Sequence, residues 1–152
     1  MFEHVFKELY DKFKLNFYRN IFGGFAERES SLTATETFCT EVIYALDKPT
    51  INEMGKFLNI SQPNITYKVN NLVKKGYVKK IQSENDKREV FLEVTDKFYN
   101  YYNVKNEYMN LVLKRARNRF SEEDLEKFEY MLSVISEDLM PEITEGMIRL
   151  KT

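Results

Sequence analysis

Cysteine and histidine, the residues that build disulfides and many metal sites, are almost absent from this sequence. Its 152 residues include one cysteine, Cys39, and one histidine, His4. A single cysteine excludes a disulfide within the chain and is typical of proteins from the reducing cytoplasm. A structural zinc site takes about four ligands, mostly cysteine and histidine, so none is predicted. The sequence also predicts no other metal site and no cofactor.

Long hydrophobic runs and catalytic motifs are missing as well. No run of about 18 apolar residues occurs, so no membrane-spanning helix is predicted. Charged residues recur from Glu3 to Lys12 and interrupt the apolar stretch that a signal peptide needs. There is no nucleophile–base pair and no glycine-rich phosphate loop, so nothing in the sequence supports an enzyme. The length suits one domain with helical extensions.

What the sequence does contain is a helix-turn-helix pattern in residues 50–95. Thr50 and Glu53 have the spacing of a capping box, which predicts the start of a first helix. Residues 59–60 are expected to form the turn. Gly76 is expected to end the second helix, because glycine readily adopts the left-handed conformation found there.

The second helix should begin after the N-cap residue Ser61, with Pro63 in its first turn. Its predicted buried stripe consists of Ile65, Val69, Leu72 and Val73. No Asp or Glu stands between Met54 and Lys80, and the opposite face is rich in amide and hydroxyl groups. Amides can bond bidentately to adenine, and hydroxyls can bond to several bases or to phosphate. This helix face therefore suits DNA.

Positive charge gathers on this stretch, although the whole chain has a net charge of −1. Residues 61–88 hold seven positive and two negative side chains, a net charge of +5. Such asymmetry is typical of a small DNA-reading face on an otherwise ordinary protein. The residues expected to face bases or nearby sugar-phosphate are Gln62, Asn64, Thr66, Tyr67 and Asn70. Those expected mostly to hold phosphates are Ser61, Lys68, Asn71, Lys74 and Lys75. The predicted DNA-binding surface also includes Pro63.

A β hairpin, or wing, is predicted to follow the second helix. Its second strand alternates as a half-buried strand should, with Val90, Leu92 and Val94 on one side. Segments 58–66 and 72–78, together with Asp86-Lys87-Arg88 in the polar loop of residues 82–88, resemble the MarR family of transcriptional regulators. The resemblance implies that Arg88 enters the minor groove and that Asp86 orients it, and Lys87 is expected to assist. A narrow, negative minor groove does attract a guanidinium group.

Helical patterns flank this region on both sides. Large apolar residues three or four positions apart predict a helix over residues 1–27. Further helices are expected over residues 33–46, where Thr33 and Glu36 form a second capping box, over residues 96–119, and from the N-cap residue Ser121 onward with a kink or restart near Pro141. The predicted fold is mainly α with a small β-hairpin wing, a winged helix-turn-helix flanked by N- and C-terminal dimerisation helices. The expected domains are residues 1–32 (dimerisation), 33–95 (DNA binding) and 96–152 (dimerisation).

The predicted helices carry more apolar surface than one core would need. The simplest assembly that covers this surface is a two-fold homodimer. Its two helix-turn-helix units would face successive major grooves of a near-palindromic DNA site. The family resemblance implies the same dimer. The alternative is a monomer whose terminal helices complete a single core.

The chain is also expected to bind a small hydrophobic or aromatic ligand, because regulators resembling this family often bind one between the dimer helices and the helix-turn-helix unit. The candidate lining residues are Phe17, Phe22, Phe25, Phe38, Tyr101 and Tyr102. The same rings are explained equally by core packing, and Phe38 is expected on the inner face of helix 33–46. Cys39 has no Lys, Arg or His nearby in sequence, so a buried, inert thiol is predicted rather than a redox sensor.

These features predict a cytoplasmic, dimeric, sequence-specific transcriptional regulator, a repressor relieved by a small effector. The alternative is a winged-helix protein-interaction module that buries its aromatic faces in another protein and does not read DNA. Salt-sensitive binding to DNA separates the two hypotheses.

Overall fold

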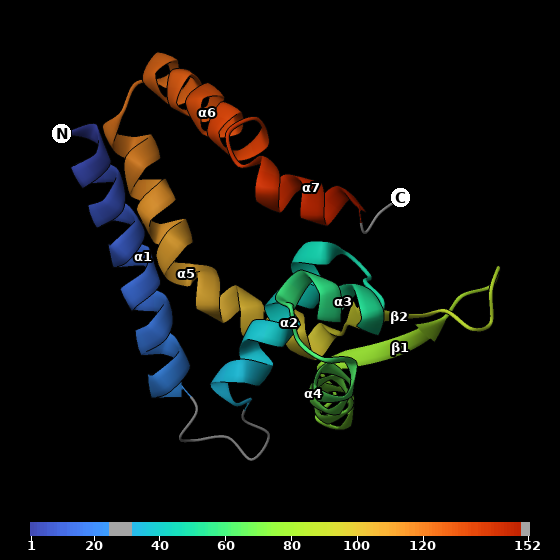
Figure 1. Ribbon diagram of the computed structural model, residues 1–152. Coiled ribbons are helices and arrows are strands. Elements are labelled where there is room, and N and C mark those ends of the chain that lie inside the picture. The colour runs from blue at the N-terminus through green and yellow to red at the C-terminus, as the bar shows by residue number, and fades with distance from the viewer. Residues whose placement is uncertain (25–31, 150–152) are drawn as a thin grey trace. The chain divides into compact units, whose positions relative to one another are not determined.

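The computed structural model describes residues 1–24 and 32–149 of the chain (Figure 1). Its elements are α1 (Phe2–Gly24), α2 (Ala34–Leu46), α3 (Ile51–Leu58), α4 (Gln62–Lys74), β1 (Val78–Gln82), β2 (Val90–Val94), α5 (Asp96–Arg119), α6 (Glu122–Glu137) and α7 (Pro141–Arg149). Two compact units are formed, Met1–Tyr108 and Met109–Thr152, and α5 contributes to both. The helical elements and the single antiparallel hairpin confirm the predicted fold class. Within the described residues, none of the helices has the length and apolar character needed to cross a membrane.

Two helices of the first unit begin with the capping boxes that the sequence predicts. At the start of α2, Glu36 Oε2 accepts the Thr33 N–H at 2.8 Å and Thr33 Oγ1 accepts the Glu36 N–H at 3.2 Å. Thr50 and Glu53 repeat this geometry at the start of α3, with distances of 2.7 and 3.2 Å. Each box satisfies two amide donors that a helix N-terminus otherwise leaves unpaired.

The turn between α3 and α4 is tight and depends on a glycine. Asn59 adopts the left-handed conformation with φ 53°, and the Ile60 N–H donates to the Gly55 carbonyl at 2.9 Å. A Cβ atom on Gly55 would lie 3.1 Å from the Ile60 carbonyl oxygen, closer than most such contacts. Ser61 occupies the N-cap position of α4 as predicted, but its side chain makes no capping hydrogen bond.

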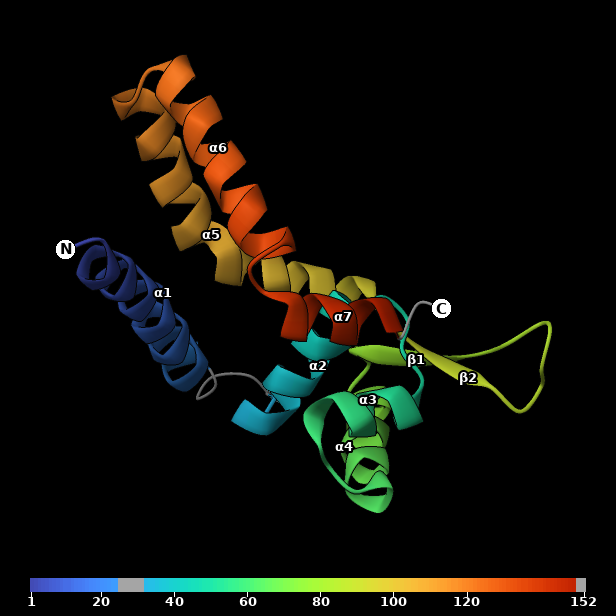
Figure 2. The same cartoon turned by 45° about the horizontal axis from the view of Figure 1, so that its top comes forward.

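The hairpin is held to the rest of the first unit by its second strand. Val78 pairs with Val94, Lys80 with Leu92 and Gln82 with Val90 in an antiparallel register. The Leu92 N–H donates to the Pro49 carbonyl at 2.8 Å, which joins β2 to the segment just before α3. The connecting loop spans residues 83–89, one residue later at each end than predicted. Its tip extends away from α3 and α4 (Figures 1 and 2).

The core of the first unit lies between α2, α3, α4, the hairpin and the start of α5. Three of the four residues predicted for the buried stripe of α4 are fully buried, namely Ile65, Val69 and Leu72, and Val73 is half-buried. They share the core with Met54, Leu92 and Phe98, whose side chains are also inaccessible to solvent. The apolar face of α4 therefore points inward and leaves its polar face outside.

Helix α1 contacts the rest of the first unit through aromatic rings. Phe13 meets Tyr108 edge to face, with ring centroids 6.3 Å apart, and Phe17 stacks on Phe38 at 6.0 Å. Phe38 was expected on the inner face of α2, but 42 % of its surface is exposed and its ring stacks on Phe17 of α1. Cys39, Ile43 and Leu46 are the buried apolar residues of α2.

The second unit consists of the end of α5 with α6 and α7. The Ser121 hydroxyl caps α6 by accepting the Asp124 N–H at 3.2 Å, and a new helix begins at Pro141, both as predicted. No residue of α6 is buried. Its large apolar side chains are exposed, and those accessible over more than two fifths of their surface are Phe128, Tyr130, Met131 and Leu132.

Candidate nucleic-acid interface

The outward face of α4 is polar, free of acidic side chains and accessible to solvent. Gln62, Asn64 and Asn70 are exposed, and Tyr67 projects from the helix with 67 % of its surface accessible. Ser61, Pro63 and Lys74 are exposed too, whereas Thr66, Lys68 and Asn71 are half-buried. The structure therefore presents most of the predicted DNA-binding residues of α4 on one side of the first unit.

A set of backbone hydrogen bonds fixes the C-terminal end of α4. The Tyr77 N–H donates to the Leu72 carbonyl at 3.0 Å and the Gly76 N–H donates to the Val73 carbonyl at 3.1 Å, the pattern of a Schellman motif. Gly76 has φ 81°, which a residue with a side chain rarely adopts, so the glycine is required there. The prediction that Gly76 ends the helix is confirmed.

The first turn of α5 holds the same end of α4. Lys97 Nζ donates to the Lys75 carbonyl at 2.8 Å, and its ammonium lies 4.6 Å from the centre of the Tyr77 ring. Thr95 Oγ1 donates to the Gly76 carbonyl at 2.6 Å. These contacts satisfy carbonyls that a helix C-terminus leaves free and place a positive charge at the negative end of the helix dipole.

Lys75 forms an ion pair that the sequence did not reveal. Its Nζ atom lies 2.7 Å from Glu36 Oε2, and the Glu36 side chain is only 8 % exposed. Burial on its own raises the pKa of the Glu36 carboxyl, but the hydrogen bonds from Lys75 and Thr33 outweigh burial and hold that pKa below its ordinary value. Lys75 was predicted to hold phosphate, and in this structure its side chain binds Glu36 of α2.

The tip of the wing is braced by short polar side chains. Asp86 Oδ1 accepts the backbone N–H of Arg88 at 2.9 Å, and Ser83 Oγ accepts the N–H groups of Asn85 and Asp86 at 3.3 Å. Gln82 Nε2 donates to the Lys87 carbonyl at 2.6 Å. Asp86 thus holds the backbone of the loop at Arg88. Both basic side chains, Lys87 and Arg88, are exposed.

Strand β1 carries two lysines that were not among the predicted site residues, and one of them contacts α4. Lys80 Nζ donates to Asn70 Oδ1 on α4 at 2.7 Å. Its neighbour Lys79 lies on the other face of the strand and forms an ion pair with Glu93 at 3.0 Å. The hydrogen bond from Lys79 holds the pKa of Glu93 below its ordinary value. The period of two in a strand, counted from buried Val78, is the signal that places Lys80 on the α4 side.

The rings predicted to line an effector pocket fall into separate groups. Phe17 and Phe38 stack on each other, Tyr102 stacks on Phe98, and Tyr101 meets Tyr77 edge to face at 6.3 Å. Phe25 and the side chain of Phe22 lie outside the described residues. Among the described residues there is a cavity of about 390 Å³ that these rings do not line. Its lining residues are Ile43, Tyr44, Ala45, Asp47, Lys48, Glu93, Val94 and Tyr99.

Cys39 has the surroundings of a structural thiol. Its side chain is 2 % exposed, and burial raises its pKa above the ordinary value although Lys68 acts in the opposite direction. A raised pKa lowers the fraction of reactive thiolate. In the parts of the chain that the structure describes, no group of three or more His, Cys, Asp and Glu side chains has the arrangement of a metal site.

Comparison with known proteins agrees with this geometry. Residues 32–90 match the model of the MarR family. Over 74 residues the chain is 28 % identical to the HTH-type transcriptional regulator YkoM of Bacillus subtilis, and the match covers 49 % of this chain. The matched region is 48 % of YkoM, so the chain spans about half the length of this curated relative.

Two solved structures share the fold over most of the chain. Streptococcus pneumoniae FabT, determined in complex with DNA, has a TM-score of 0.60 and 21 % identity, and the match covers 91 % of this chain and 97 % of FabT. Staphylococcus aureus MepR, determined with bound ethidium bromide, has a TM-score of 0.58 and 17 % identity, with 92 % and 97 % covered. At these identities the likeness is one of fold.

Proposed function

We propose that this chain, whose residues 32–90 match the model of the MarR family, is a sequence-specific DNA-binding transcriptional regulator of that family. The observation that carries the proposal is the acid-free, exposed face of α4 beside a braced wing whose tip exposes Lys87 and Arg88. A helix of that composition can lie in the major groove without charge repulsion, while the wing reaches the flanking groove. The similar fold of FabT, whose structure contains DNA, supports the same conclusion.

The proposed contacts divide into those that read bases and those that hold the backbone. Gln62, Asn64, Thr66, Tyr67 and Asn70 face bases or nearby sugar-phosphate. Ser61, Pro63, Lys68, Asn71 and Lys74 lie along the phosphates, and Lys87 and Arg88 approach the minor groove from the wing. The Lys75 side chain must break its ion pair with Glu36 before it can reach a phosphate, so we assign Lys75 a smaller contribution to the DNA affinity.

The proposal includes a homodimer that binds a near-palindromic site. Support comes from the apolar side chains that each unit leaves exposed, among them Phe2 and Phe6 on α1 and Phe128 and Met131 on α6. Large apolar side chains that stay exposed on helices are typical of surfaces that bind another protein. In this assignment residues 1–32 and 96–152 dimerise and residues 33–95 bind DNA.

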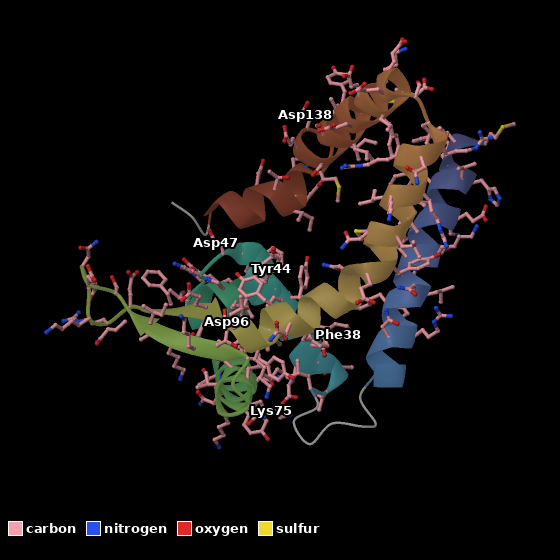
Figure 3. All side chains as sticks on the ribbon, turned by 180° about the vertical axis from the view of Figure 1, so that it is seen from behind. Phe38, Tyr44, Asp47, Lys75, Asp96 and Asp138 are labelled. Atoms are coloured by element: carbon pink, nitrogen blue, oxygen red, sulfur yellow. The ribbon has the colours of Figure 1, made fainter. Side chains whose placement is uncertain are left out.

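Relief of repression by a small hydrophobic or aromatic effector is the remaining part of the proposal. Its support is the supply of partly exposed rings in the first unit, such as Phe38 and Tyr44, and the fold shared with MepR, which was determined with ethidium bromide. Figure 3 shows Tyr44 on α2 beside the start of α5, where it packs against Phe98 and Tyr99.

Fluorescence anisotropy tests the proposal with DNA from the region upstream of the protein's own gene. Tighter binding to this DNA than to a scrambled sequence, weakening as salt rises, is the expected result, because each neutralised phosphate adds about 0.9 to the slope of log affinity against log salt. Equal, weak binding to both sequences contradicts sequence-specific reading of this region. A chain that binds neither DNA at low salt but forms a one-to-one complex with another protein is an interaction module instead.

A further inference from the structure

A hydrogen bond joins the polar face of α4 to the wing at exposed positions. Lys80 Nζ on β1 lies 2.7 Å from the side-chain oxygen of Asn70. A lysine ammonium has three donors and no acceptor, so the atom of Asn70 that faces it must be the amide oxygen. The contact therefore fixes the direction of the amide, with its NH₂ group turned away from Lys80.

Both side chains stand on rigid parts of the first unit. Lys80 opposes Leu92 in the hairpin register, and Leu92 is completely buried. Asn70 directly follows Val69, which is also completely buried. The pair thus has a fixed place between the helix and the wing, and its two groups are exposed together.

The hydrogen-bonding capacity of the pair is one-sided. Its only acceptor is the Asn70 amide oxygen, which already binds an ammonium, and the positive charge disfavours a second donor there. Two N–H groups of the amide and two of the Lys80 ammonium are still available. The pair therefore offers donors to whatever lies against it, unlike a lone asparagine, which offers one donor and one acceptor together.

We propose that Asn70 and Lys80 act as one donor unit that selects guanine in each half of the DNA site. In the major groove guanine presents two acceptors, N7 and O6, whereas adenine presents one acceptor and one donor. Thymine presents one acceptor and a methyl group, and cytosine a donor. Guanine is thus the base whose edge matches the pair. This inference rests on the proposed function, since it assumes that α4 lies in the major groove.

Asn64 provides an internal contrast on the same helix. It is exposed, and in the described part of the chain its amide has no hydrogen-bond partner. It is therefore free to turn either way and can pair bidentately with adenine, as asparagine commonly does. Two asparagines on one helix are assigned different bases because only one of them is held by a lysine.

Selection of binding sites from a randomised DNA pool tests the inference with the full chain and three variants. Lys80→Met removes the ammonium but keeps the length of the stem, and releases the Asn70 amide. Asn70→Ala removes the amide itself. Lys79→Met is the matched control, because it removes a lysine from the neighbouring position that is paired with Glu93 instead.

The wild-type chain and Lys79→Met are expected to select sites with the same guanine in each half. For Lys80→Met the ratio of guanine to adenine at that position should fall by about tenfold or more, the size of one good bidentate contact. Asn70→Ala should lose its preference at the same position and keep the others.

Three outcomes overturn the inference, and one of them also overturns the proposed function. If Lys80→Met selects the same bases as the wild type with uniformly weaker affinity, Lys80 is a phosphate contact. If Asn70→Ala and Lys80→Met alter different positions, the two residues do not act together. A wild-type chain that enriches no sequence at all contradicts sequence-specific binding, and the inference fails with it.

Discussion

Replacing Glu36 with glutamine removes the charge that binds Lys75 while keeping an oxygen that can accept the Thr33 N–H. Glu36 Oε2 and Lys75 Nζ lie 2.7 Å apart. The Glu36 side chain is 8 % exposed and the Lys75 side chain 31 %. A hydrogen bond between charged groups contributes about 1.5–3 kcal/mol when buried, and water compensates part of its loss here. We therefore expect Glu36→Gln to lower the free energy of unfolding by about 1–2 kcal/mol at neutral pH.

The effect of this substitution should depend on pH in a defined direction. Burial opposes the charged form of Glu36, but the hydrogen bonds from Lys75 and Thr33 prevail and its pKa is lowered on folding. A lowered pKa gives stability that is complete above the pKa of the unfolded chain, about 4.3, and is lost as the pH falls through the folded value. The difference between wild type and Glu36→Gln should thus shrink progressively below about pH 4.3.

Urea unfolding followed by circular dichroism measures these differences, and the chain offers its own control. Glu53 caps α3 with the same geometry as Glu36 caps α2, and no ion pair of Glu53 occurs in the described residues. Glu53→Gln therefore reports the cost of changing a capping carboxylate to an amide. Equal losses in Glu36→Gln and Glu53→Gln, or a loss in Glu36→Gln that persists undiminished at low pH, would refute the role of the ion pair.

Three further predictions concern the backbone, the thiol and the dimer. Gly76→Ala should lower the free energy of unfolding in urea by about 1–2 kcal/mol because of the φ of 81° alone, since the added methyl group would meet nothing closer than 3.8 Å. An unchanged unfolding midpoint contradicts this prediction. Cys39 should react with a thiol reagent far more slowly in the native chain than in urea, and equal rates would show that it is accessible. Phe128→Glu should shift the chain toward monomer in sedimentation equilibrium, because it places a charge on the apolar side of α6, whereas Lys127→Glu should leave the association unchanged.

Local signals in the sequence predicted the elements of the first unit well. Both capping boxes depend on residues three positions apart, and the end of α4 depends on a single glycine at position 76, so each can be recognised without knowledge of the fold. The buried stripe of α4 was found for the same reason, since its period of about 3.6 residues is written along one helix.

Contacts between distant segments were out of reach of the sequence. Glu36 and Lys75 are 39 positions apart, and nothing near either residue indicates that they meet. Phe38 has the spacing of an inner residue, but α1 supplies a second surface on which it stacks. The Asn70–Lys80 contact needs the register of the hairpin as well as the direction of α4. The side-chain pairs that position the candidate site therefore appear only once the tertiary packing is known.

The most direct test of DNA reading by α4 and the wing is the affinity of Arg88→Ala for a site selected by the wild-type chain. Anisotropy titrations over a range of salt concentrations, with sedimentation to confirm an unchanged assembly, supply the measurement. Loss of one charged contact, about 1.5–3 kcal/mol, predicts binding weaker by about tenfold or more, with the dimer and its unfolding unaffected. An Arg88→Ala chain that binds the selected site as tightly as wild type at moderate salt would contradict the assignment of the wing.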